Sequence, residues 1–591
     1  MTDDDANDDA DRGGEEIADG GKGLQTDLFH PESEREPGDT NIQKWGFDVH
    51  PVVFPVSLVL IATFVGATLL LGSSARTTYA AVKSFFNQNF GWFFLLAVNL
   101  FIAVLLFFAF SKYGKIRIGG VEAEKEFSDF SWMAMLFSAG MGIGLMFFSV
   151  SEPLYYYTNV PGFFAADPRT GAAGVAALAQ TFFHWGFHPW AIYGLVGLGL
   201  AFFSFNRGLP LTFRSIFWPL LGDRIYRWPG HLIDLVTVFA TLFGLATSLG
   251  FGVSQINTGL SYILGPRMLG LVVIPRGTMP QIALIAIITG IATLSVAAGL
   301  EGGVERLSTL NLYLMFALLG FVLLVGPTVY LLGVWAQGLG AYLTHLPGLA
   351  FFTGVLGTGQ STVHAWTVFY WAWWISWSPF VGLFIARISK GRTVREFVVG
   401  VLVIPSVFST FWMAVFGGSA LHNSLLGNGD VLTLYQEFGQ TVATFAVLEE
   451  FPLGAISGLL ATLLVVTFFV TSSDSGSLVV DHLTSGGKQD VPRTQRVFWA
   501  VTEGAVAALL LYGGGLAALR TAAVATGFPF AIILVVMCYT VYLGLQKEYE
   551  ILQSEEFADR IQTLTEKDVD IDRSRTEVVT DIQENAEAGD D

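Results

Sequence analysis

Twelve stretches of about twenty mostly apolar residues constrain this 591-residue sequence more than any other feature. A bilayer core about 30 Å thick requires about 20 apolar residues in each helix that crosses it. Each stretch is therefore predicted to form one transmembrane helix. A further segment, Gly338–Phe352, is interrupted by glycine and proline and is predicted to lie as a helix at the membrane interface. The predicted spans cover approximately residues 52–72, 92–111, 130–150, 176–204, 232–258, 281–300, 312–335, 364–388, 397–418, 453–473, 496–519 and 525–545.

The charged residues are unevenly distributed along the chain. The formal net charge is −18, although only 14% of the residues are charged. Residues 1–50 hold 15 acidic and 4 basic residues, residues 546–591 hold 15 and 5, and residues 51–545 hold 19 and 22. A membrane domain at 51–545 is therefore predicted between two acidic tails, the first disordered and the second partly helical. This acidic balance argues against a nucleic-acid partner.

Basic residues gather in alternate loops between the predicted spans. If the N-terminus is cytoplasmic, the inner loops hold 16 Lys and Arg residues and the outer loops hold 6. Lys and Arg favour the cytoplasmic side of a membrane. We therefore expect a multi-pass protein of the cell membrane with both termini in the cytoplasm.

The third span contains three glycines at alternate positions, Gly140, Gly142 and Gly144. Each costs about 1 kcal/mol relative to alanine inside a helix. Glycines also pack membrane helices against one another, but packing glycines usually recur every four residues on one face. A locally unwound helix explains this spacing better, because freed backbone groups are tolerated where they line a cavity.

The fourth span carries aromatic and imidazole side chains. On a continuous helix, Trp185, Trp190 and Tyr193 fall on one side, although such stripes more often pack than bind. His184 and His188 have the i, i+4 spacing of a metal-ligand pair. No carboxylate or third histidine in a nearby span completes a metal site, so both are predicted to form hydrogen bonds.

The eighth span contains five of the fifteen tryptophans within twelve residues. A quaternary ammonium cannot donate a conventional hydrogen bond, so the faces of aromatic rings are its natural partners. Pro379 is predicted to break this helix. Interruptions in the third and eighth spans would mark spans 3–7 and 8–12 as inverted repeats of a transporter. The residues that share one face of the eighth span are Trp366, Phe369, Tyr370, Trp373 and Trp377.

The tenth span carries a hydroxyl-rich run with one acid, from Thr471 to Ser475. Polar groups deep in an apolar segment are costly and usually face the interior of the bundle. Hydroxyl and carbonyl oxygens suit a hard cation such as Na⁺. Hydrogen bonding between helices is the alternative explanation for this run.

These motifs together resemble one known family. The run from Trp366 to Phe397 is similar to the signature of the betaine/choline/carnitine transporter family, and so are the three-glycine run, Ser151-Glu152-Pro153 and the run Thr471–Ser475. The resemblance covers about residues 45–545. It implies secondary transport of trimethylammonium compounds, a LeuT-like fold with two extra N-terminal helices and, usually, a homotrimer.

The resemblance also implies roles for individual residues. The central aromatic box matches Trp185, Trp190, Tyr193 and Trp374, with Trp373 beside it. The outer pathway matches Phe369 and Trp377. The sodium site matches the hydroxyls of Thr471 and Ser472 and the backbone carbonyls of Ser138 and Met141.

Two positions refine the expected substrate and coupling ion. Gly144 stands where choline-selective relatives resemble one another in carrying Asp, and a glycine suits a zwitterion, whose carboxylate can meet free backbone N–H groups. A second sodium site in the family uses two threonines and a phenylalanine. Thr241 and Phe468 match it, but Leu245 replaces the second threonine, so one Na⁺ is expected.

We therefore predict Na⁺-coupled import of glycine betaine or a related zwitterionic osmolyte by alternating access, with no cofactor besides the ion. The alternatives are proton-coupled or exchange transport of choline or carnitine, and an osmolyte-binding membrane sensor. A membrane-embedded enzyme is disfavoured, because the sequence has no P-loop, zinc-protease or nucleophile-elbow motif.

Overall fold

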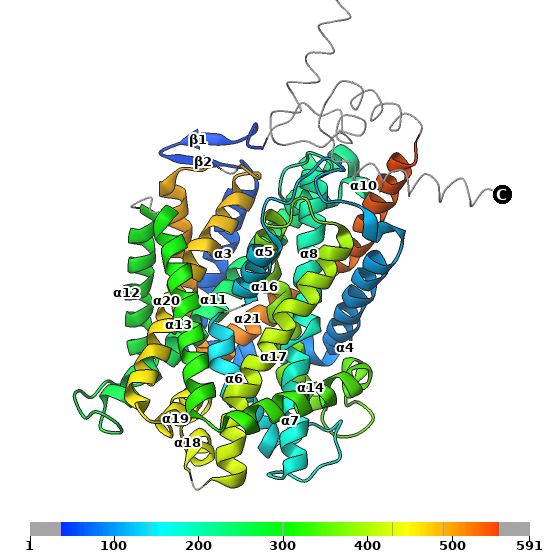
Figure 1. Ribbon diagram of the computed structural model, residues 1–591. Coiled ribbons are helices and arrows are strands. Elements are labelled where there is room, and N and C mark those ends of the chain that lie inside the picture. Colours follow the sequence, from blue (N-terminus) through cyan, green and yellow to red (C-terminus); the bar gives the residue numbers. More distant parts are fainter. Residues whose placement is uncertain (1–36, 141, 298–300, 428, 489, 555–591) are drawn as a thin grey trace, which may run out of the picture.

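The computed structural model describes residues 37–140, 142–297, 301–427, 429–488 and 490–554 as a bundle of long helices (Figure 1). A two-stranded antiparallel hairpin, β1 (Ile42–Lys44) and β2 (Phe47–Val49), covers one end of the bundle. Both ends of the described chain lie at this hairpin end. The short helices α18 (Val431–Phe438) and α19 (Ala443–Glu449) lie at the opposite end. The two predicted tails fall largely outside the described residues.

The other α-helices differ widely in length. In chain order they are α3 (Val53–Leu71), α4 (Ala75–Phe110), α5 (Asp129–Gly140), α6 (Ile143–Thr158), α7 (Gly171–Trp185), α8 (Phe187–Phe205), α9 (Phe213–Ile216), α10 (Trp218–Leu221), α11 (Trp228–Leu264), α12 (Thr278–Ala297), α13 (Glu301–Val325), α14 (Thr328–Phe351), α15 (Gln360–Thr362), α16 (Val368–Arg387), α17 (Val394–Leu426), α20 (Gly454–Thr484) and α21 (Arg493–Leu552).

Nine helical segments within the described residues are long and apolar enough to cross a membrane. This confirms the prediction of an all-α protein with many membrane-spanning helices. The longest element, α21, has 60 residues and is divided at Gly515, whose φ of 63° and ψ of −152° are non-helical. Glycine adopts this positive φ without the steric cost that an L side chain would meet.

The boundary of the seventh predicted span is wrong. The sequence placed one helix over residues 312–335, whereas α13 ends at Val325 and α14 begins at Thr328. Gly326 and Pro327 separate the two helices, and proline lacks the N–H that would continue the first. The described α14 includes nearly all of the segment predicted to lie at the interface. It is not among the nine candidate spans and runs obliquely across the bundle (Figure 1).

The predicted break at Pro379 is also wrong. Helix α16 continues through Pro379 to Arg387. A proline in a helix leaves the carbonyl four residues earlier without its N–H donor, which here is the carbonyl of Ile375. The hydroxyl of Ser378 donates to this carbonyl at 2.7 Å and replaces the missing donor. The irregular part of this span is its beginning, where residues Val363–Thr367 form a π-helix.

The hairpin is tied to the loop between α20 and α21. Lys488 Nζ donates to the Asp48 carboxylate at 2.6 Å, and the backbone N–H of Asp48 donates to Gln495 at 2.9 Å. Burial opposes ionisation of Asp48, but the hydrogen bonds from Lys488 and its neighbours outweigh it and hold the pKa of Asp48 below its usual value. The N-terminal segment is thereby fixed to the end of α20.

Candidate functional site

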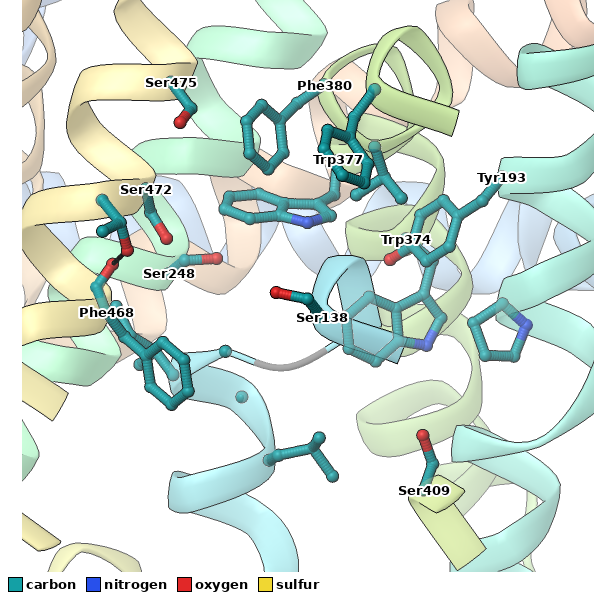
Figure 2. A pocket seen from close by; sticks show the side chains of 18 of the residues that line it. Ser138, Tyr193, Ser248, Trp374, Trp377, Phe380, Ser409, Phe468, Ser472 and Ser475 are labelled. Carbon is teal, nitrogen blue, oxygen red and sulfur yellow. Dashed lines mark hydrogen bonds between the residues drawn. The ribbon is translucent and has the colours of Figure 1, made fainter. Parts of the chain in front are cut away.

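A cavity of about 170 Å³ lies between the broken helix pair α5–α6 and helices α7, α8, α13, α16 and α20. Figure 2 shows Ser138, Tyr193, Trp374 and Ser472 around it. The residues that line it are Ser138, Gly142, Ile143, Gly144, Leu145, Trp185, Pro189, Trp190, Tyr193, Ser248, Ser308, Asn311, Trp373, Trp374, Trp377, Phe380, Val381, Phe384, Ser409, Phe468, Thr471, Ser472 and Ser475.

Five aromatic residues from three helices form one wall, which we call the aromatic box. They are Trp185, Trp190, Tyr193, Trp373 and Trp374. The ring of Trp374 lies 4.9 Å from that of Trp185 at 74° and stacks on Trp373 at 4.5 Å. Trp190 and Tyr193 meet nearly edge to face, with ring centroids 5.4 Å apart. Rings at different angles around one cavity can present π-faces to a cation from several sides.

A break in the fourth predicted span positions the first of these rings. The sequence predicted one continuous helix, but α7 ends at Trp185 and α8 begins at Phe187. A Cβ on the intervening Gly186 would lie 2.7 Å from both the Phe182 carbonyl oxygen and the Tyr342 hydroxyl. Only glycine fits this close approach. The break places Trp185 at the end of one helix and Trp190 near the start of the next.

The glycine run of the third span is unwound, as predicted. Helix α5 ends at Gly140, and α6 begins at Ile143 after the extended residue Gly142, which caps α6 without a side-chain hydrogen bond. Gly142 and Gly144 line the cavity, so the N-terminus of α6 opens onto it. Free N–H groups at a helix N-terminus attract anions.

Gly144 allows close contact between α6 and the aromatic box. A Cβ at this position would lie 2.9 Å from the nearest atoms of both Trp185 and Trp373. Any larger side chain here would therefore displace an indole ring. The structure gives this glycine a packing role in addition to the substrate preference expected from the sequence.

Glu152 of α6 holds the aromatic box in place from behind. Its carboxylate accepts hydrogen bonds from the indole N–H of Trp185 at 2.9 Å and from the hydroxyl of Tyr370 at 2.5 Å. The Nδ1 atom of His184 lies 2.6 Å from the same carboxylate. Glu152 and His184 are fully buried. The sequence flagged Glu152 only as part of a family motif and not as the group that orients Trp185.

Both histidines of the fourth span are hydrogen-bonded, as predicted. His184 also contacts Thr367 at 2.9 Å through Nε2, and His188 contacts Asn99 at 3.1 Å. The described residues contain no group of three or more His, Cys, Asp or Glu side chains able to hold a metal ion. These imidazoles therefore connect helices.

The residues predicted to bind sodium lie together on the cavity wall. Ser138, Thr471 and Ser472 all line the cavity, and Met141 lies outside the described residues. The Thr471 hydroxyl donates to the Thr467 carbonyl at 3.0 Å, and its oxygen also accepts a hydrogen bond, which leaves one lone pair for an ion. Asn311 of α13 donates to Thr471 at 3.2 Å. The sequence analysis missed Asn311, although an amide in an apolar span was a usable signal.

The two residues that match the second sodium site, Thr241 and Phe468, differ in their relation to the cavity. Thr241 does not line the cavity, and its hydroxyl donates to the Thr237 carbonyl of its own helix at 2.8 Å. Phe468 does line the cavity. Leu245 packs closely against Gly476 of α20, where a Cβ would lie 2.4 Å from the leucine side chain. These contacts add no support for a second ion here.

The two predicted pathway residues lie on opposite sides of the aromatic box. Trp377 follows the box along α16 and lies beside Phe380 on the cavity wall (Figure 2). Phe369 precedes the box, is fully buried and does not border the cavity. It packs with Phe251 and Tyr370, and Tyr370 also packs with Trp366; we call these four residues the closing aromatic layer. All four side chains of this layer are buried.

Comparisons with known proteins identify one family of transporters. A profile of the betaine/carnitine/choline family of transporters matches residues 52–550. The chain is 45% identical over 518 residues to a glycine betaine/proline/choline transporter of Vibrio parahaemolyticus, covering 85% of this chain and 91% of that one. It is 45% identical over 525 residues to glycine betaine transporter 1 of the same bacterium, covering 86% and 96%.

A third relative is the glycine betaine transporter of Acinetobacter baylyi. It is 41% identical over 500 residues, which cover 84% of this chain and 74% of that protein. The relatives and the family are transporters and not enzymes. The chain belongs to the betaine/carnitine/choline family of membrane transporters.

Proposed function

We propose that the protein imports glycine betaine or a closely related zwitterionic trimethylammonium osmolyte, driven by Na⁺, through alternating access. The substrate class is inferred from two properties of the cavity taken together: its aromatic box and the absence of formal charge on its wall. None of the described residues lining the cavity is Asp, Glu, Lys or Arg. A cation without an anionic group would meet the rings but leave its net charge uncompensated in an apolar setting.

A zwitterion matches both halves of the cavity. Its trimethylammonium group has no N–H donor, so it is best held by the rings of the aromatic box. Its carboxylate has a partner in the exposed N-terminus of α6. The relatives named as glycine betaine transporters support the same substrate.

The proposed sodium site explains how binding could be coupled. The hydroxyls of Thr471 and Ser472 on α20 and the backbone at Ser138 on α5 border one cavity. An ion between them would connect α20 to the broken helix that also contacts the substrate. Ion and substrate would then stabilise the same closed arrangement of helices, which is the thermodynamic requirement for coupling.

The decisive experiment is uptake of labelled glycine betaine into proteoliposomes with and without an inward Na⁺ gradient. We expect uptake to fall at least about tenfold without Na⁺, because coupling energies of 1–3 kcal/mol correspond to 5–150-fold effects. Thr471→Ala and Ser472→Ala should each raise the Na⁺ concentration needed for half-maximal uptake.

Ser473→Ala is a matched control, because Ser473 is adjacent in sequence but does not line the cavity. Equal uptake with and without Na⁺ would reject sodium coupling, and a dependence on a proton gradient would favour the proton-coupled alternative. A sensor that binds without transporting would show no counterflow of labelled betaine.

We also propose twelve membrane crossings with both tails in the cytoplasm. The nine candidate spans become twelve when the broken pair α5–α6 and α12 are included and α21 is divided at Gly515. Spans 3–7 and 8–12 would form two inverted repeats, and three copies of the chain would form a homotrimer.

The orientation is tested with two single-cysteine variants, Lys112→Cys and Arg169→Cys. A membrane-impermeant thiol reagent added from outside should modify only Arg169→Cys. Labelling of both would reject the orientation, and cross-linking that stops at dimers would reject the trimer.

A further inference from the structure

Arg520 lies beyond the closing aromatic layer and has no acidic partner among the residues that the structure describes. It belongs to α21, five residues after the division at Gly515. Its guanidinium carbon lies 5.0 Å from the ring centroid of Phe369, 5.6 Å from that of Phe251 and 5.8 Å from that of Trp366. One arginine therefore stands over the rings of three residues from the closing aromatic layer.

The polar contacts of Arg520 leave its charge uncompensated. Its Nη2 donates to the Gln440 side chain at 3.0 Å, and its Nε is buried without a hydrogen-bond partner. No carboxylate in the described part of the chain lies within ion-pair distance of it. Lys83 of α4 is close enough to add a second positive charge to its surroundings. A partly buried cation without a counter-ion is costly, and such residues in a membrane protein usually serve function.

The position of Arg520 places it between the aromatic box and the end of the bundle away from the tails. Phe369 and Phe251 both contact Trp373 of the box, with ring centroids 5.6 and 5.4 Å apart. On the other side, Gln440 belongs to the connection between α18 and α19, which lie at the end opposite the hairpin (Figure 1). Arg520 is partly exposed. Solvent therefore reaches the guanidinium side of the closing aromatic layer.

We propose that Arg520 is an outer selectivity residue, which binds the carboxylate of an entering zwitterion and repels cations that carry no anionic group. This inference rests on the proposed function, because it requires a substrate with both a trimethylammonium group and a carboxylate. A guanidinium matches a carboxylate in shape and can donate two parallel hydrogen bonds to it.

The same arrangement discriminates against choline. Choline carries a trimethylammonium group but no carboxylate, so it would approach Arg520 and Lys83 with a net positive charge and gain no ion pair. The uncharged cavity wall favours betaine over choline at the inner site. Arg520 favours betaine over choline at an earlier step, before the substrate reaches the aromatic box. Arg520 acts on entry and does not contact the cavity itself.

The test compares Arg520→Gln with Arg520→Lys in cells or oriented vesicles, where substrate enters only from outside. The measured quantity is the ratio of the inhibition constant of choline to the apparent KM of betaine uptake. We expect Arg520→Gln to lower this ratio about tenfold, since a charge-assisted hydrogen bond contributes 1.5–3 kcal/mol. Arg520→Lys keeps the charge and should retain most of the ratio. Equilibrium binding of betaine to the purified protein, read by tryptophan fluorescence, should change less than about twofold in both variants.

Arg276→Gln is the matched control. Arg276 also lies over an aromatic ring, that of Phe438 at 5.2 Å, but it is exposed and distant in sequence from the closing aromatic layer. It should leave the ratio unchanged. An unchanged ratio in Arg520→Gln, or an equal loss in Arg520→Gln and Arg520→Lys, would overturn the assignment. Wild-type protein that takes up choline in place of betaine would instead reject the proposed function, and with it the carboxylate partner of Arg520.

Discussion

Replacing Trp374 with leucine should raise the apparent KM for betaine about 30-fold. Trp374 lies at the centre of the aromatic box, stacked on Trp373 and nearly perpendicular to Trp185. A desolvated cation–π contact contributes about 2 kcal/mol, which corresponds to about 30-fold in affinity. Leucine keeps an apolar side chain but removes the π-face. The measurement is the concentration dependence of labelled betaine uptake at saturating Na⁺.

Two further variants separate ring chemistry from folding. Trp374→Phe keeps an aromatic face and should recover most of the lost affinity. Trp92→Leu is the control, because Trp92 is exposed and its indole N–H bonds only to the Asn89 carbonyl of its own helix. A wild-type KM in Trp374→Leu would remove Trp374 from the binding site. An equal loss in Trp374→Phe would show that indole volume matters and not the π-face.

Replacing Glu152 with glutamine should reduce uptake by about 100-fold or more. Trp185 and Tyr370 both donate to the same oxygen of the buried carboxylate, and a glutamine would replace these bonds to a charged group with weaker bonds to a neutral amide oxygen. A hydrogen bond to a charged group contributes 1.5–3 kcal/mol, so loss of one strong bond corresponds to about 100-fold. Trp185 would then be free to rotate out of the aromatic box. Uptake and thermal stability of the purified protein are the two measurements.

Glu437→Gln makes the same chemical change at an exposed position of α18 and should leave uptake unchanged. Glu152→Asp keeps the charge with a shorter reach and should restore part of the activity. If Glu152→Gln transports betaine with wild-type kinetics, Glu152 does not position the box. If it loses stability but the surviving protein binds betaine normally, its role is structural only.

The sequence predicted the chemistry of the site better than the path of the backbone. Polar groups deep in an apolar span usually face the bundle interior, and a tryptophan cluster that runs well into its helix is unlike an interfacial belt, so the clusters in the eighth and tenth spans already indicated the cavity wall. The unwound glycine run was readable because three glycines at alternate positions do not share one packing face of a helix. The break at Gly186 was not readable, since its cause is the hydroxyl of Tyr342, which comes from α14, distant in sequence.

The errors have a common physical origin. Pro379 breaks a helix only if the freed carbonyl finds no donor, and here the preceding serine supplies one. Arg520 was counted only as a basic residue of an outer loop, because nothing local in the sequence shows that α21 carries it to the rings of Phe251 and Phe369. A side-chain contact decides both cases, a local one for Ser378 and a long-range one for Arg520.

The uncharged wall of the cavity has an electrical consequence. A zwitterion has no net charge, and the cavity wall carries none. The charge that crosses the membrane in each transport cycle would therefore equal the charge of the coupled ions. Each such charge gains about 2.3 kcal/mol from a membrane potential of 100 mV. One ion per cycle would then add about 50-fold to the betaine gradient that the cell can sustain. The reversal potential of betaine-dependent current would count the ions directly.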